Sequence, residues 1–199
     1  MRVQCFKATP FALGDQLFLN FDQIIPIQDA EDFTVSMARK TQDEIVTQRN
    51  LETRHYIRRE FWAEMLLRLK GKTPIFQNSK PTVEHWLSTE DIDTDWIIYT
   101  MVYTRSYAGV RIELARPNKD ENKRLFKELY TYKNEIEKDF EAKLNWESLD
   151  NKTTSRITYN LQDVDIFNRE EWSGVLDFLE TNMIKLERVF RDKVERLKL

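Results

Sequence analysis

Residues 96–115 read WIIYTMVYTRSYAGVRIELA, and this stretch is the clearest indication of the fold. Trp96 to Tyr103 is rich in β-branched and aromatic side chains, which favour extended structure. After a short connection that ends before Gly109, apolar side chains alternate with polar ones as far as Leu114. A connection of this length is typical of a hairpin, so the pattern predicts two antiparallel strands.

Helical periodicity flanks this hairpin on both sides. From Thr41 to Leu69 the chain has no Pro or Gly, and large apolar side chains recur every four residues towards the end of the stretch. Asn118 is a suitable cap for a second helix, whose apolar stripe runs to Phe140. A closing helix with apolar side chains at steps of three and four begins near Trp172.

The N-terminal segments are shorter. Two extended segments, Val3–Lys7 and Gln16–Ile25, flank turn signals at Pro10 and at Gly14-Asp15. They predict a hairpin or two edge strands, followed by a short helix from about residue 29 to residue 39.

The loop 73–95 is expected to contain only a short turn of helix at Glu84–Leu87, and Ser155–Leu161 alternates as a further strand. The order is β-β-(α)-α-β-β-α-β-α, which predicts an α+β fold with an antiparallel sheet covered by long amphipathic helices. Residues 1–40 are predicted to form an N-terminal strand pair and short helix, and residues 41–199 the main α+β domain.

Composition excludes several classes of protein. The 199 residues contain 31 Lys and Arg and 34 Asp and Glu, so the net charge is -3 and no global field attracts nucleic acid or anionic lipid. Cys5 is the single cysteine, which excludes an internal disulfide, fits a reducing compartment and leads us to expect a cytoplasmic location. No membrane-length apolar run, glycine-rich phosphate loop or zinc-type spacing occurs, so we expect no membrane contact, no cofactor and no metal.

The segment 54–72 is locally basic, with six basic and two acidic residues. A basic helix face is the usual electrostatic footprint of nucleic-acid binding. The candidates for such binding are Arg54, Arg58, Arg59 and Arg68. The alternative is that this face closes on the acidic series that follows at Glu84, Glu90, Asp91, Asp93 and Asp95, or is only solvated.

Three charged residues fall on neighbouring strands and could share one face. Arg111 and Glu113 are two apart on one strand, and Arg156 lies on another. With His85 they are candidates for a polar cleft. The alternatives are a cross-strand ion pair covered by a helix and, for His85, a structural ring hydrogen bond.

Two further functions stay open. A divergent nuclease could use Glu113 and Asp150-Lys152 with magnesium, but acid-x-Lys occurs three times, about as often as composition predicts, and we assign no catalytic residue. The closing helix has heptad-like spacing and could form a homodimer, although packing on the sheet is the more ordinary role of such a stripe.

Short motifs spread along the chain carry a family resemblance. They are Phe61-Trp62, Pro81, His85-Trp86-Leu87, Arg111-Ile112-Glu113-Leu114, Ile136-Glu137, Trp146-Glu147, Ser155-Arg156-Ile157 and Trp172. Their order, from about His55 to Leu197, resembles a family of bacterial and archaeal domains of unknown function that usually follow restriction-endonuclease-like nuclease domains.

The resemblance implies a nuclease-linked setting in defence or DNA processing, and no mechanism. The segment before His55 is too short for such a nuclease domain. If a separate protein supplies the nuclease, this chain would be an accessory subunit, and if not, it would stand alone as a binding module. We therefore expect a non-enzymatic accessory or binding module whose partner is nucleic acid or a nuclease-type protein.

Overall fold

The computed structural model of the chain describes residues 5–13, 16–25, 28–89 and 97–196. The chain divides into two compact units, Met1–Glu52 and Thr53–Leu199, and helix α1 (Gln28–Leu69) contributes residues to both. The helix expected to end near residue 39 and the helix expected from Thr41 are one continuous helix, so α1 runs through the predicted boundary at residue 40. Neither Pro nor Gly interrupts this stretch, which explains why the helix does not stop there.

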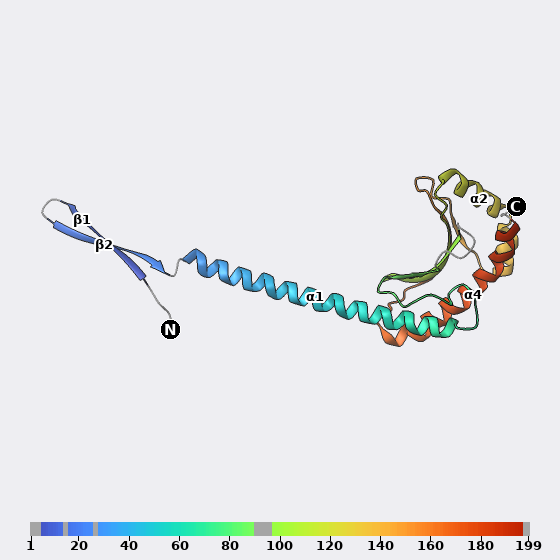
Figure 1. Ribbon diagram of the computed structural model, residues 1–199, viewed down its shortest axis with the longest axis horizontal. Helices are drawn as coiled ribbons and strands as arrows, with labels where there is room; N and C mark the ends of the chain where they lie inside the picture. Colours follow the sequence, from blue (N-terminus) through green and yellow to red (C-terminus); the bar gives the residue numbers. More distant parts are fainter. Residues whose placement is uncertain (1–4, 14–15, 26–27, 90–96, 197–199) are drawn as a thin grey trace. The chain divides into compact units, whose positions relative to one another are not determined.

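The larger unit contains a five-stranded antiparallel sheet (Figure 1). The spatial order of its strands is β3-β4-β5-β7-β6, and they span β3 (Trp86–Ser88), β4 (Ile97–Tyr103), β5 (Tyr107–Leu114), β6 (Asn145–Glu147) and β7 (Ser155–Gln162). The hairpin predicted from residues 96–115 is the β4–β5 pair, in which Met101 lies opposite Val110. The predicted α+β class is confirmed.

The two outer strands are the part of the sheet that the sequence did not predict. β3 replaces the short helix expected at Glu84–Leu87, because its backbone pairs with Thr100–Val102 of β4. β6 pairs with residues 156–158 of β7. Each has three residues, too few for an alternating pattern to be recognised.

Three further helices pack with the sheet: α2 (Lys119–Thr131), α3 (Lys133–Phe140) and α4 (Trp172–Arg196), the last preceded by a 3-10 turn, η1 (Arg169–Glu171). The side-chain oxygen of Asn118 accepts from the N–H groups of Asp120 and Glu121, so the predicted cap is confirmed. The single helix expected up to Phe140 is wrong, because it breaks at Tyr132, whose N–H donates to the carbonyl of Leu129 at 3.0 Å.

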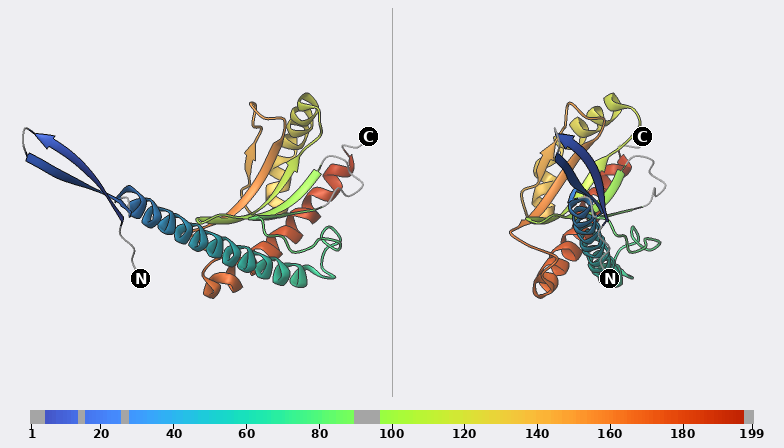
Figure 2. Two further views of the ribbon diagram at one scale, coloured as in Figure 1. Left: turned by 60° about the vertical axis from the view of Figure 1, so that its left-hand side comes forward. Right: turned by 90° about the vertical axis from the view of Figure 1, so that its left-hand side faces the viewer.

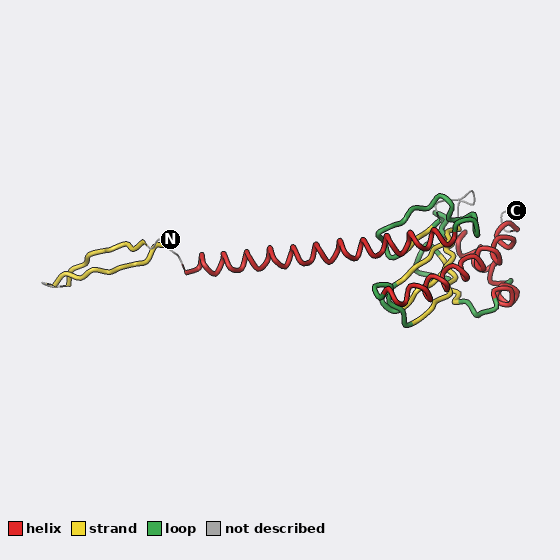
Figure 3. Tube along the Cα trace, turned by 90° about the horizontal axis from the view of Figure 1, so that it is seen from below, coloured by secondary structure: helices red, strands yellow, loops and turns green. Residues whose placement is uncertain are grey.

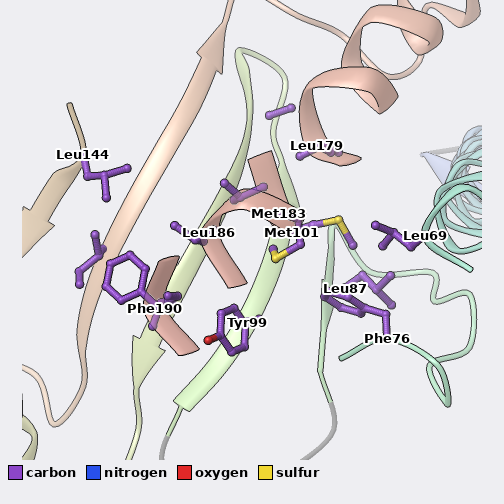
Figure 4. Packing of buried hydrophobic residues seen from close by; sticks show 14 of the residues in the cluster. Leu69, Phe76, Leu87, Tyr99, Met101, Leu144, Leu179, Met183, Leu186 and Phe190 are labelled. Carbon is purple, nitrogen blue, oxygen red and sulfur yellow. The ribbon is translucent and has the colours of Figure 1, made fainter. Parts of the chain in front are cut away.

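The core lies between one face of the sheet and the helices (Figures 2 and 4). Met101 and Tyr99 of β4 pack with Met183 and Leu186 of α4. Leu69, at the end of α1, belongs to the same cluster. The apolar stripe of α4 is therefore buried inside this unit, as expected for a helix that packs on the sheet. Among the described helices, none is long and apolar enough to cross a membrane.

The smaller unit contains a two-stranded antiparallel ribbon, β1 (Cys5–Leu13) and β2 (Gln16–Ile25), followed by the first part of α1 (Figure 3). Pro10 was expected to signal a turn, but it lies within β1 opposite Leu19. The other turn signal, Gly14-Asp15, and the acidic residues Glu90, Asp91, Asp93 and Asp95 lie outside the described residues.

Candidate nucleic-acid interface

Arginines from two distant parts of the sequence meet at a small cavity of the larger unit. The cavity has a volume of about 230 Å³ and is lined by Arg54, Arg58, His85, Tyr103, Thr104, Arg105 and Phe167. We call this set the basic pocket. It is formed by α1, by the segment before β3, by the end of β4 with the turn that follows, and by the segment before η1.

Arg58 is the best-anchored cation of the basic pocket. Arg54 and Arg58 are four residues apart on α1, which places them on the same helix face. Arg58 is half-buried, and its Nη1 donates to the carbonyl of Val83 at 3.0 Å. Its Nε is buried and has no hydrogen-bond partner among the described residues. This guanidinium is thus held in place with donor capacity left over.

An aromatic cluster supports the pocket from beneath. The Trp62 indole donates to the carbonyl of Glu84 at 2.9 Å, and the Tyr103 hydroxyl lies 3.4 Å from the same oxygen. The rings of Trp62 and Tyr103 are 5.4 Å apart, and Phe61 contacts both. Because these rings are buried, the segment that carries His85 is fixed against α1 before any ligand arrives.

The pocket is electropositive. Its lining contains three arginines and no carboxylate, and Arg54 and Arg105 are exposed. Within the described part of the chain, none of the three forms an ion pair. Burial raises the pKa of Tyr103, an effect that the neighbouring Arg58 opposes, so the hydroxyl stays a neutral donor. The charge of Glu84 also raises the pKa of Tyr103, by less than burial does.

The structure separates the four predicted arginines. Arg54 and Arg58 line the basic pocket together with His85, which was predicted for a different site. Arg59 is exposed and lies outside the lining. Arg68 is neutralised by two ion pairs, one with Glu64, whose Oε1 lies 3.2 Å from its Nη2, and one with Asp177 of α4.

The remaining polar-cleft candidates form an ion-pair ladder. The Nε of Arg111 lies 3.2 Å from Oε1 of Glu113. Glu113 is in turn the register partner of Arg156. The Nε of Arg156 donates to Glu147 of β6 at 2.6 Å, and this bond raises the pKa of Arg156. Each charge has an opposite neighbour, so these residues balance one another on the sheet surface, and His85 is not one of them.

The acid-x-Lys residues mostly hold the fold together. Lys123 of α2 donates to the carbonyls of Leu149 and Thr154 at 3.0 and 2.7 Å, and burial lowers its pKa. Asp150 accepts a hydrogen bond from Ser148. Among the described residues, no group of three or more His, Cys, Asp or Glu side chains is arranged to hold a metal ion.

Sequence reasoning missed Tyr103, Thr104, Arg105 and Phe167 as members of the pocket. Arg105 lies in the connection of the predicted hairpin, where a basic residue in a tight turn was the available signal. Nothing in the local pattern of Phe167 indicates a site, since only the packing of the segment before η1 brings it to α1.

The family profile described as "Domain of unknown function (DUF4268)" matches residues 57–194, well over half of the chain. No curated protein and no solved structure matches it. All of the basic pocket except Arg54 lies inside the matched region. The chain therefore belongs to the DUF4268 family of domains of unknown function.

Proposed function

We propose that this chain is a non-enzymatic nucleic-acid-binding module of a nuclease-linked system in the cytoplasm, and that the basic pocket is its contact with the phosphate backbone. The observation that carries the proposal is the convergence of Arg54, Arg58 and Arg105 without acidic partners in the described part of the chain. Planar guanidinium groups suit phosphate oxygens, because two N–H groups can bind two oxygens at once.

The size of the pocket favours a polymer over a free small molecule. At about 230 Å³ it is smaller than the ~300 to 1,000 Å³ typical of small-molecule sites. It can receive one phosphate with part of its nucleotide, while Arg54 and Arg105 at the exposed rim reach neighbouring phosphates. Phe167 offers an aromatic surface beside the arginines, which suits an unpaired base.

Net charge sets the expected strength of binding. With a total of -3, the chain has no long-range attraction for nucleic acid, so affinity must come from these few contacts. About three phosphate contacts imply a logarithmic salt dependence of roughly -2 to -3. We expect measurable binding at low salt and its loss at high salt.

The test is fluorescence anisotropy of labelled single-stranded and duplex DNA at low salt. Arg58→Glu should weaken binding at least about tenfold, because it removes a contact and places a carboxylate among the remaining arginines. Arg59→Glu is the matched control, since it makes the same charge change on the adjacent, exposed residue outside the pocket. Equal effects of the two substitutions, or no binding by the wild type, would rule out the pocket as the interface.

A further inference from the structure

The β1–β2 ribbon has two chemically different faces. The register pairs Ala8 with Phe21, Pro10 with Leu19 and Ala12 with Leu17, and paired residues project to the same side. The apolar side chains of the first face, which we call the apolar face, are Phe6, Ala8, Pro10, Ala12, Leu17, Leu19 and Phe21, and the register partner of Phe6 is Gln23. The other face has Lys7 opposite Asp22, Thr9 opposite Asn20, Phe11 opposite Phe18 and Leu13 opposite Gln16.

The apolar face is exposed within its own unit. All seven of the apolar side chains named above are exposed, Leu17 by 74% and Phe21 by 64%. On the other face, Phe11 and Phe18 are 53% and 40% exposed, and their rings stack on each other with centroids 5.4 Å apart. An isolated two-stranded ribbon is marginally stable in water, and exposed apolar patches of this kind mark contact surfaces.

Charge and area indicate what covers this face. It carries no charged side chain, so two copies of it can meet without like-charge repulsion and without leaving a charge buried. At about 200 Å² for a fully exposed large side chain, its four large residues present on the order of 500 Å² per copy. A stable interface has about 800 Å² per partner. With the three smaller residues, the face approaches the size that a modest dimer needs.

Face-to-face packing is the arrangement that uses this surface. Pro10 lacks an N–H group, and proline is tolerated in strands where the missing donor would face outward, so the outer edge of β1 is a poor template for another strand. Joining two ribbons edge to edge would also leave both apolar faces in water. Two ribbons stacked at about 10 Å bury both faces at once.

We propose that two copies of the chain associate through the apolar faces of their β1–β2 ribbons, as a symmetric two-layer sandwich. This dimer does not depend on the basic pocket, which lies in the other unit. It also uses a different surface from α4, whose apolar stripe is buried within its own chain.

The first experiment measures mass in solution by analytical ultracentrifugation of the full chain over a concentration series. The wild type should rise from 24.0 kDa towards twice that mass at high micromolar concentration. Leu19→Lys should weaken the dimer at least about tenfold, because it buries a charge. Asn20→Lys, the neighbour on the opposite face, should leave the dissociation constant within about twofold.

A second experiment uses a substitution that the ribbon tolerates, so a failure to fold cannot hide the answer. In a Cys5→Ser background, Ala8→Cys should give a covalent dimer with a short bis-maleimide, and Thr9→Cys on the other face should not. A wild type that stays monomeric at every concentration overturns the proposal and leaves this face to a different protein or a lipid. Equal cross-linking of the two cysteine variants overturns it as well.

Discussion

The first and last turns of the basic segment 54–72 carry the same kind of residue in opposite situations. Arg54 and Arg58 meet Arg105 and have no acidic partner in the described part of the chain. At the other end, Arg68 pairs with Glu64 and Asp177, and Lys72 pairs with Glu180. What packs against each turn makes the difference, because α4 brings carboxylates to the last turns and the β4–β5 turn brings an arginine to the first.

A run of positive charge is therefore not by itself a binding surface. A paired arginine contributes modestly to stability and has little attraction left for a ligand. Arg58 keeps a buried Nε that has no hydrogen-bond partner among the described residues, so part of its donor capacity is available to an anion.

Trp62 lies between the two ends of the segment and should matter more than either. Its side chain is fully buried, and its indole holds the carbonyl of Glu84 in the segment that carries His85. Trp62→Ala should cost about 3 to 5 kcal/mol of unfolding free energy through the cavity that it leaves. Thermal and urea denaturation measure this cost. Leu67→Ala, 71% exposed on the same helix, should change stability by less than about 0.5 kcal/mol.

Glu137 extends the contrast to a buried charge that is fully paired. Its side chain is 3% exposed and accepts hydrogen bonds from Lys143, from the Leu144 N–H and from the Trp146 indole. Burial alone would raise its pKa, but these bonds outweigh burial and hold the pKa below the ordinary value. Glu137→Gln should cost about 1.5 to 3 kcal/mol at neutral pH.

The sign of the pH effect follows from that lowered pKa. Stabilisation by Glu137 is complete above the unfolded-state pKa of about 4.3 and is lost as the pH falls through the folded-state value. Unfolding free energies measured between neutral and acidic pH should therefore converge for the wild type and Glu137→Gln at low pH. A difference that stays constant with pH would contradict this account.

Arg58→Met should separate function from stability. The substitution keeps most of the apolar stem and removes the guanidinium, so DNA binding should weaken about tenfold, or ~1.4 kcal/mol. Stability should stay within about 0.5 kcal/mol, since the buried unpaired Nε disappears along with the bond to Val83. A large loss of stability with unchanged binding would make this arginine structural.

Arg68→Met should lower the stability slightly and leave DNA binding unchanged, and its effect should be the smallest of these substitutions. The guanidinium pairs with Glu64 and Asp177 at the partly exposed surface, where an ion pair is worth about 0.2 to 1 kcal/mol. A double-mutant cycle with Asp177→Ala measures the coupling, which salt should reduce. DNA binding should not change beyond about twofold, and a tenfold loss would place the interface along the whole helix face.

The elements predicted best are those with long, regular periodicity. The α4 stripe, the Asn118 cap and the β4–β5 hairpin follow from local spacing, because each needs only its own residues to show the pattern. β3 and β6 were missed since short edge strands are defined by the strands they pair with. The break at Tyr132 was missed because apolar spacing continues through it.

The candidate site was predicted only in part, because its residues come from segments that lie far apart in the sequence. The charge composition of the helix indicated four arginines as candidates for nucleic-acid binding, Arg54, Arg58, Arg59 and Arg68. Composition alone could not show which of them are free to bind a ligand. Arg105 and Phe167 come from segments about 50 and 110 residues further along the chain, so only tertiary packing joins them to α1.

Side-chain periodicity within one segment is sufficient to define helices and strands, so the sequence alone predicts an α+β fold with long helices. Local composition also identifies the segment that carries excess positive charge. Which arginines are neutralised and which converge depends on how the segments pack in the folded chain. Electrostatic interactions depend on distances between segments far apart in the chain, and the folded core sets those distances.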